Sequence, residues 1–215
     1  MHIGVLGTGD VGQTLGTKLV QLGNEVMMGA RDPANPKAIA WARQEGEHAS
    51  FGNYSDAASF GGLLFNCTLG SASMDALRQA GEDNLDGKIL IDTSNPLDYS
   101  DDNWTLTVGN TDSLGEQIQR NYPNTRVVKT LNTVNSNVMV DPGKLIEKTD
   151  VFVSGNDLEA KAEVVKILRD WFGWKSVIDL GDIRTARAVE AYVLLWRSLR
   201  KEINTVRFNI KVVSA

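Results

Sequence analysis

The chain has 215 residues, of which 42% are hydrophobic and 23% charged, the composition of an ordinary globular protein. Its net charge of −5 argues against a nucleic-acid-binding protein, because phosphate binding depends on an excess of Lys and Arg. The apolar runs are too short to cross a bilayer, and the N-terminus lacks the pattern of a secretion signal. We therefore expect a cytoplasmic protein that binds neither membranes nor nucleic acid.

Cysteine and histidine are scarce in the chain. Cys67 is the single cysteine, which excludes an internal disulfide and suits a reducing compartment. The two histidines, His2 and His48, have no cysteine or histidine partners at the spacing of metal ligands. We therefore expect no structural metal site.

Apolar strand-like runs alternate with longer amphipathic patterns, which is typical of parallel strand–helix–strand units. In chain order we predict a strand (2–7), a helix (11–23), a strand (25–30), a helix (35–46), a short strand (48–52), a short helix or turn (54–61) with Ser55 as its N-cap, and a strand (62–69). There follow a helix (71–81), a strand (87–95), a polar loop (98–112), a helix (113–123) and two strands (125–133 and 150–155). After these we predict a helix (157–173), a strand (176–181), a long helix (183–203) and a terminal strand or extended tail (205–213). This order predicts an α/β fold with a doubly wound, mostly parallel sheet and a C-terminal helical element.

The segment GTGDVG at 7–12 has the glycine spacing of a dinucleotide-binding loop. It follows an apolar strand and opens a helix, which is the context that such a loop requires. Gly7 permits the tight turn, Gly9 lets the backbone approach a pyrophosphate, and Gly12 lets the helix pack against the sheet. Backbone N–H groups at the helix start, including those of Asp10 and Val11, would then face the pyrophosphate. The alternative is an ordinary glycine turn in an unrelated α/β protein.

The end of the second predicted strand distinguishes NAD from NADP. NAD sites usually place an acidic residue there to bind the ribose hydroxyls, but this strand ends in Ala30. Arg31 follows, with a guanidinium suited to a 2′-phosphate, and Thr8 and Lys37 are further candidates for that phosphate. We predict NADP; the alternatives are that Arg31 is an ordinary surface side chain or that Asp32 is the ribose-binding acid of an NAD enzyme.

Ligands of doubly wound sheets bind outside the carboxyl ends of the strands. The segments 66–73, 92–97 and 129–134 leave three neighbouring predicted strands, and each carries small or polar groups. We expect this region to face the nicotinamide. Its candidate contacts are Thr68, Leu69, Asn95, Pro96 and Asn132.

Residues suited to acid–base chemistry are few near these segments. We expect Cys67 to be a buried thiol, because no histidine lies nearby in sequence to activate it. Asp92 and Asp98 are predicted to be solvated carboxylates near a loop, and the sequence does not orient Lys129. Reduction of a ketone usually needs a proton donor, whereas a flavin-like acceptor spreads the negative charge over its ring. The pattern is compatible with hydride exchange between two flat rings and with no catalytic side chain.

Five ordered blocks resemble the NADP oxidoreductases that depend on the 8-hydroxy-5-deazaflavin coenzyme. They are IGVLGTGDVGQTLGTKLVQLGNEVMMGARDP, IDTSNPL, RVVKTLNTV, DVFVSGNDLEAKAEVVKIL and AVEAYVLLWRSL. The chain is similar to the bacterial relatives of these enzymes and to the cytosolic NADPH-oxidising domain of six-transmembrane metalloreductases. The resemblance covers nearly the whole chain.

The resemblance implies a Rossmann domain, direct hydride exchange between NADPH and a flavin or deazaflavin, and a homodimer. It implies that Thr8, Gly9, Asp10 and Val11 line the pyrophosphate and that Arg31 binds the 2′-phosphate. The chain departs from the family pattern in having Ala30 where a serine often stands. It also has TLGSAS where the deazaflavin enzymes carry a proline-rich segment.

The helix predicted over 183–203 is apolar on several faces, with Ala188, Ala191, Leu195 and Leu199 along one stripe. It either packs on its own domain and a second subunit or is simply buried in the monomer. We therefore divide the chain into a Rossmann domain (1–180) and a C-terminal helix and tail (181–215) for dimerisation or for the substrate cleft. Two other hypotheses stay open, a non-catalytic NADP-binding regulator and a classical alcohol or imine dehydrogenase.

Overall fold

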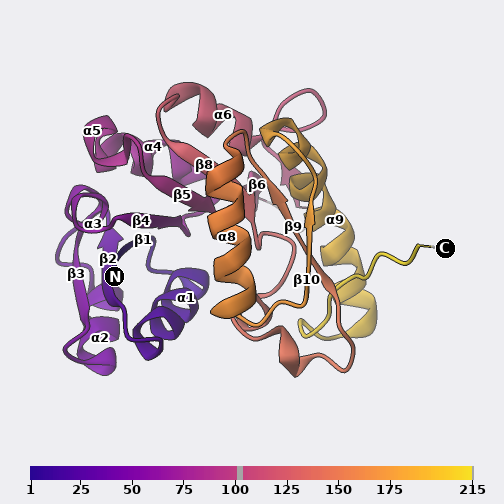
Figure 1. Cartoon of the computed structure of the whole chain (residues 1–215), viewed down its shortest axis with the longest axis horizontal. Coiled ribbons are helices and arrows are strands. Elements are labelled where there is room, and N and C mark those ends of the chain that lie inside the picture. Colours follow the sequence, from indigo (N-terminus) through magenta and orange to yellow (C-terminus); the bar gives the residue numbers. More distant parts are fainter. Residues whose placement is uncertain (101–103, 215) are drawn as a thin grey trace.

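The computed structural model describes residues 1–100 and 104–214, in which an eight-stranded sheet carries helices on both faces (Figure 1). The first half of the chain forms β1 (His2–Leu6), α1 (Asp10–Gln21), β2 (Glu25–Ala30), α2 (Pro36–Glu45), β3 (Ala49–Asn53), α3 (Tyr54–Phe60), β4 (Leu63–Asn66), α4 (Gly70–Ala80), α5 (Glu82–Leu85), β5 (Ile89–Asp92) and β6 (Leu97–Asp98). The second half forms β7 (Thr105–Leu106), α6 (Leu114–Asn121), β8 (Arg126–Thr130), α7 (Ser136–Met139), the 3-10 turn η1 (Pro142–Lys144), β9 (Asp150–Ser154), α8 (Leu158–Asp170), β10 (Ser176–Asp179), η2 (Ile183–Thr185) and α9 (Ala186–Ile203).

The strand order across the sheet is β10-β9-β8-β5-β4-β1-β2-β3. Six strands, from β8 to β3, are parallel. The strand order reverses between β1 and β4, because β2 and β3 extend the sheet on one side of β1, and β4, β5 and β8 extend it on the other. This order confirms the predicted doubly wound Rossmann sheet and places its ligand crevice at the carboxyl ends of β1 and β4. Strand β9 pairs antiparallel with β8, and β10 then runs parallel to β9.

The central strands are buried on both faces, and their successive residues belong to opposite layers of the core. Phe65 of β4 packs in a cluster with side chains of α1, α2 and α8. Leu64, its neighbour, packs in a second cluster with side chains of α3, α4 and α6. In Figure 1, α8 crosses the face of the sheet that is turned toward the viewer. The alternation of side chains along each strand therefore produces the two layers.

Two local predictions are corrected by the structure. Ser55 is not the N-cap of α3. Asn53 is the N-cap, because its side chain accepts a hydrogen bond from the Asp56 N–H at 2.8 Å and the Asp56 carboxylate accepts one from the Asn53 N–H at 2.8 Å. The predicted loop 98–112 contains β7, which pairs antiparallel with β6. Residues 101–103 of that loop lie outside the described residues.

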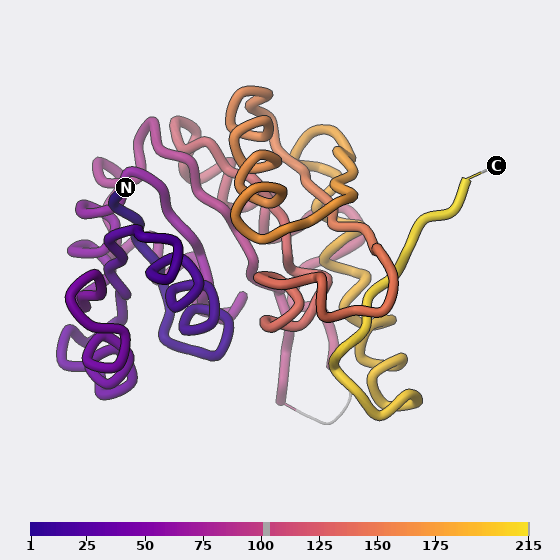
Figure 2. Tube along the Cα trace, turned by 60° about the horizontal axis from the view of Figure 1, so that its bottom comes forward, coloured from indigo at the N-terminus to yellow at the C-terminus, as the bar shows by residue number. Residues whose placement is uncertain are grey.

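The segment 205–213 is an extended tail, not a strand. It lies against the start of β9, where the Asp150 N–H donates to the Ile210 carbonyl at 3.3 Å and the Asn209 amide donates to the Asp150 carbonyl at 2.8 Å. The tail runs past α9 and away from the N-terminal half of the chain (Figure 1, Figure 2).

Helix α9 buries one face and exposes the stripe that the sequence marks as apolar. Val189 and Val193 are buried against the domain, whereas Ala188, Ala191 and Leu195 are exposed, Leu195 by 54%. Leu199, the fourth residue of the stripe, is half-buried, so three of the four residues are not buried in the monomer. Within residues 1–100 and 104–214, no helix is long and apolar enough to cross a membrane.

Packing at Gly12 gives a test of the fold. A Cβ atom at this position would lie 2.1 Å from the Gly7 carbonyl oxygen, so Gly12→Ala must move α1 away from the sheet. We expect the free energy of unfolding in urea to fall by about 1–3 kcal/mol or more. Gly9→Ala is the matched control, because a Cβ there meets nothing within 4 Å and φ is −78°. Its unfolding free energy should stay within about 1 kcal/mol of wild type; an equal loss in both variants would contradict the packing role of Gly12.

Candidate functional site

A cavity of about 540 Å³ opens at the carboxyl ends of β1, β4 and β5. The end of β1 contributes the glycine loop, β4 contributes the segment that starts α4, and β5 contributes a short polar turn. The lining residues are Gly7, Thr8, Gly9, Asp10, Val11, Tyr54, Cys67, Thr68, Leu69, Gly70, Ala72, Thr93, Ser94, Asn95 and Tyr99. Eight of the fourteen residues proposed from the sequence therefore meet in one cavity.

The glycine loop has the features that a pyrophosphate requires. Gly7 adopts φ +121°, and a Cβ there would lie 2.6 Å from the Cys67 carbonyl oxygen, so only glycine fits the turn. Gly9 caps α1 without a side-chain hydrogen bond to the first-turn N–H groups. The space beside Gly9 is open, so neither packing nor backbone strain explains a glycine at this position. Glycine here leaves the backbone open toward the cavity.

The second helix at the cavity also begins without a side-chain cap. Leu69 is the N-cap of α4 and has an extended backbone. Gly70 follows, and a Cβ there would lie 2.0 Å from the Asn95 carbonyl oxygen, so the start of α4 is in close contact with the turn after β5. The N-terminal ends of α1 and α4 therefore border the same cavity.

The end of β2 lies at the edge of the site and not in the cavity lining. Ala30 is buried, and the Arg31 side chain that follows is 69% exposed with its guanidinium 3.5 Å from Asp75. Asp32 accepts a hydrogen bond from the Ala34 N–H at 2.9 Å, which forms a turn before α2. Lys37 is exposed on the first turn of α2. Asp32 therefore stabilises a local turn, whereas the Arg31 side chain is accessible from solvent.

Asn132, predicted to contact the coenzyme, lies behind the cavity. Its amide donates to Asn95 Oδ1 at 2.9 Å and to the Val189 carbonyl at 3.0 Å, and Asn95 donates back to the Asn132 carbonyl at 2.9 Å. Asn132 thereby holds Asn95 in the cavity wall and joins it to α9. Pro96 is buried beside Asn95 and does not line the cavity. Gly12 lies beneath the glycine loop.

The cavity contains residues that the sequence interpretation did not name as contacts. Tyr54 comes directly after β3, at the edge of the sheet, and Tyr99 comes from the turn after β6. Ser94 and Thr93 belong to the segment after β5 that was expected to face the nicotinamide, which is the only signal that could have identified them. Burial raises the pKa of the Tyr54 and Tyr99 phenols above the ordinary value.

Cys67 lines the cavity as a protonated thiol. The side chain is buried, and burial raises the pKa of the thiol to about 12. A thiol in this state is a poor nucleophile, in keeping with its predicted role as a buried side chain. Within residues 1–100 and 104–214, no three His, Cys, Asp or Glu side chains are grouped so that they could hold a metal ion.

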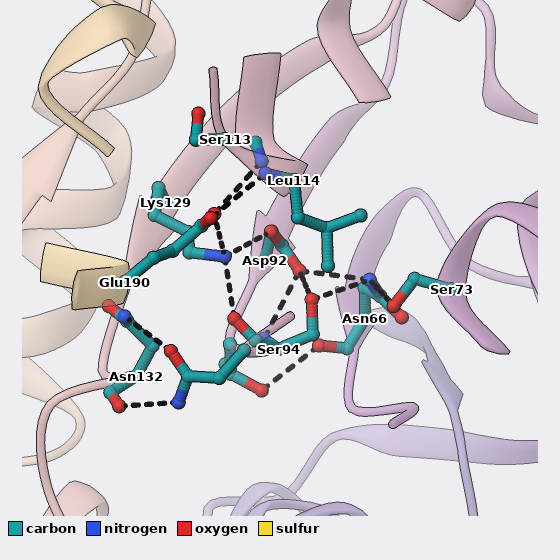
Figure 3. A network of polar contacts seen from close by, with 12 residues as sticks. Asn66, Ser73, Asp92, Ser94, Ser113, Leu114, Lys129, Asn132 and Glu190 are labelled. Atoms are coloured by element: carbon teal, nitrogen blue, oxygen red, sulfur yellow. Dashed lines mark hydrogen bonds and ion pairs between the residues drawn. The ribbon is translucent and has the colours of Figure 1, made fainter. Parts of the chain in front are cut away.

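Asp92 and Lys129 form a buried ion pair beneath the cavity, which corrects the prediction that Asp92 is solvated. Both side chains are fully buried, and Lys129 Nζ donates to Asp92 Oδ2 at 2.8 Å (Figure 3). The same ammonium lies 2.8 Å from Glu190 Oε1 and donates to the Ser94 carbonyl at 2.6 Å. Burial by itself would lower the pKa of Lys129, but the two carboxylates raise it above the ordinary value. With three acceptors around it, Lys129 is not placed as a proton donor to a substrate.

Asp98, on β6, is partly exposed, and its carboxylate accepts from the Ser100 N–H at 2.8 Å.

Comparison with known proteins agrees with this architecture. The family model described as NADP oxidoreductase, coenzyme F420-dependent, matches residues 2–96. A crystal structure from Arthrobacter sp. FB24, assigned as an F420-dependent NADP reductase, is 46% identical over the full length of both chains with a TM-score of 0.95. The chain belongs to the coenzyme F420-dependent NADP oxidoreductase family. The predicted resemblance is thereby confirmed, and the family is one of NADP-dependent oxidoreductases.

Two curated relatives are metalloreductases. STEAP3 from Rattus norvegicus is 30% identical over 192 residues, and human STEAP2 is 27% identical over 202 residues. The matches cover 89% and 91% of this chain but only 36% and 37% of the relatives. The chain therefore spans about a third of the length of these metalloreductases.

The buried lysine gives a test of the site's structure. Lys129→Met would leave Asp92 and Glu190 buried without their cation, so we expect the free energy of unfolding in urea to fall by about 3–5 kcal/mol. Lys148→Met, at an exposed position, is the control and should change stability by less than about 0.5 kcal/mol. A Lys129→Met protein as stable as wild type would show that the ammonium does not hold these segments together.

Proposed function

We propose that the cavity holds NADP(H) with its pyrophosphate at the N-terminus of α1. Gly7, Thr8, Gly9, Asp10 and Val11 would surround the pyrophosphate, with Asp10 contributing its backbone N–H and not its carboxylate. The open space at Gly9 and the uncapped first turn of α1 support this placement. Gly12 contributes indirectly, because it brings α1 close to the loop.

The adenosine half would extend toward β2. We assign the 2′-phosphate to Arg31, with Lys37 adding positive charge from α2 and Ala30 leaving room where an acidic residue would repel the phosphate. The support is the exposure of the Arg31 guanidinium beside the cavity and the local engagement of Asp32.

The nicotinamide half would then extend toward β4 and β5. Thr68, Leu69 and Asn95 line that part of the cavity, whereas Asn132 and Pro96 position Asn95 from behind. When bound, NADPH supplies a hydride, and the protein's contribution is to hold and orient the two reacting rings.

The acceptor we propose is a flavin or deazaflavin. This choice rests on the side chains of the cavity: Cys67 is protonated and buried, and the Lys129 ammonium is fully engaged. An acceptor that delocalises charge over its ring needs no protein acid. Tyr99 supports a second candidate, a carbonyl or imine reductase, because its phenol lines the cavity and could donate a proton.

We further propose a division of roles along the chain. Residues 1–180 would form the coenzyme domain, and residues 181–215 would form a C-terminal element. The apolar stripe of α9, which includes the exposed Leu195, and the exposed Leu194 beside it would form a homodimer interface. The small-molecule acceptor and the single cysteine are compatible with a cytoplasmic location.

Steady-state NADPH oxidation with flavins, deazaflavin, ferric chelates, ketones and imines tests the acceptor. We expect turnover with a flavin or deazaflavin, and a change of less than about threefold in kcat for Tyr99→Phe, because no protein proton donor is used. Turnover restricted to carbonyl or imine substrates and lost in Tyr99→Phe would favour the second candidate. Tight NADPH binding with turnover of none of these compounds would favour a non-catalytic regulator.

The coenzyme assignment is tested with Arg31→Ala. We expect the Kd of NADPH to rise about 10- to 100-fold, because a charge-assisted contact with the phosphate is lost. The Kd of NADH should change less than about threefold, because NADH has no 2′-phosphate. Coenzyme fluorescence titration measures both values. Arg43→Ala, an exposed arginine elsewhere on α2, is the control and should alter neither. Equal losses for NADPH and NADH would show that Arg31 does not bind the 2′-phosphate.

A further inference from the structure

Asp92, Lys129 and Glu190, here called the buried trio, combine two acids with one base in the interior. The three side chains are 0%, 0% and 2% exposed. They come from β5, β8 and α9, which meet at the carboxyl ends of the strands beneath the cavity (Figure 3). Neither the fold nor the binding of a pyrophosphate requires this excess of acid.

The hydrogen bonds around both acids indicate that both are ionised. Asp92 accepts from the Asn66 amide at 2.9 Å, the Ser94 hydroxyl at 2.6 Å and the Ser94 N–H at 3.2 Å, in addition to Lys129. Glu190 accepts from the Leu114 N–H at 2.8 Å and the Gly115 N–H at 3.0 Å. These neighbours are donors, whereas a protonated acid would need an acceptor. The trio therefore carries a net charge of −1.

Neighbouring charges leave this excess in place. Glu116, on the first turn of α6, pairs with Arg187 and contributes no net charge. The N–H groups at the start of α6 stabilise Glu190, since they form the positive end of the helix dipole. That partial charge reduces the field of Glu190 more than that of Asp92, which lies on the side of Ser94.

The trio is separated from the cavity by one residue. Ser94 lines the cavity, and its hydroxyl and N–H both bind Asp92 Oδ1. The proposed function places the nicotinamide half of NADP(H) on this side, and the next step rests on that placement. Loss of a hydride with its electron pair from NADPH to a flavin-type acceptor leaves one positive charge on the nicotinamide ring. A buried negative charge nearby stabilises that product relative to neutral NADPH.

We propose that the buried trio tunes the hydride equilibrium of the bound coenzyme. Its net negative charge favours NADP+ over NADPH at the site and makes bound NADPH a stronger hydride donor. Asp92 is the acid of the trio that binds Ser94 of the cavity lining, so it is a positioning and electrostatic residue that acts through Ser94.

The test is the ratio of the Kd of NADP+ to the Kd of NADPH, measured by calorimetry on the full chain. Asp92→Asn brings the trio to neutrality, and we expect this ratio to rise about three- to tenfold, because one buried unit charge near the cavity is removed. Asp92→Asn combined with Lys129→Met removes one charge of each sign and keeps −1. The remaining charge is then on Glu190, whose field the N–H groups of α6 reduce. The ratio of the double variant should therefore lie between those of wild type and Asp92→Asn, although it loses more contacts than the single variant.

These variants distinguish the electrostatic role of the trio from the proposed binding of NADP(H). A folded Asp92→Asn protein with an unchanged ratio overturns the electrostatic role, as does an equal shift in the single and double variants, which would show an effect of geometry. If Asp92→Asn does not fold, Glu190→Gln makes the same neutralisation from α9 and should shift the ratio in the same direction; no shift overturns the proposal. Failure of the wild-type protein to bind either coenzyme would instead overturn the proposed function.

Discussion

The ammonium of Lys129 is the interaction on which the arrangement of the carboxyl ends depends. A lysine buried in a parallel sheet must have its three N–H groups bound, and no residue of its own strand can bind them. The acceptors come from Asp92 and Ser94 at the end of β5 and from Glu190 on α9. Because Glu190 also binds the first N–H groups of α6, the positions of α6, α9 and the turn after β5 depend on one another.

Features that depend on residues close in sequence were predictable. The alternation of apolar runs predicted the order of most strands and helices, and the glycine spacing predicted a tight turn before α1. The prediction for the end of β2 also rests on neighbouring residues, because Ala30 and Arg31 follow each other directly, and it stays a prediction. Each of these predictions needs only one segment and its local geometry.

Features that depend on distant partners were not predictable. Asp92 was expected in solvent because it lies near a predicted loop, but its cation lies 37 residues further along the chain. The antiparallel direction of β9 cannot be predicted from the alternation of apolar residues along a strand, because a period of two is the same in both directions. Tyr54 lines the cavity from the start of α3, and Tyr99 lines it from the segment after β6. Only the folded sheet brings these two segments together.

Stability alone does not account for ionised groups at this place in the core. Moving two carboxylates and an ammonium out of water costs about as much as their attraction returns, so apolar side chains of similar volume would give a core at least as stable. What apolar residues cannot do is bind the N-terminus of α6, hold the Ser94 carbonyl in place or maintain a charge one residue from the cavity. The first two tasks require polar atoms but no excess of acid. An unbalanced charge distinguishes between the two states of a neighbour whose own charge changes, and hydride transfer changes the charge of a nicotinamide by one unit.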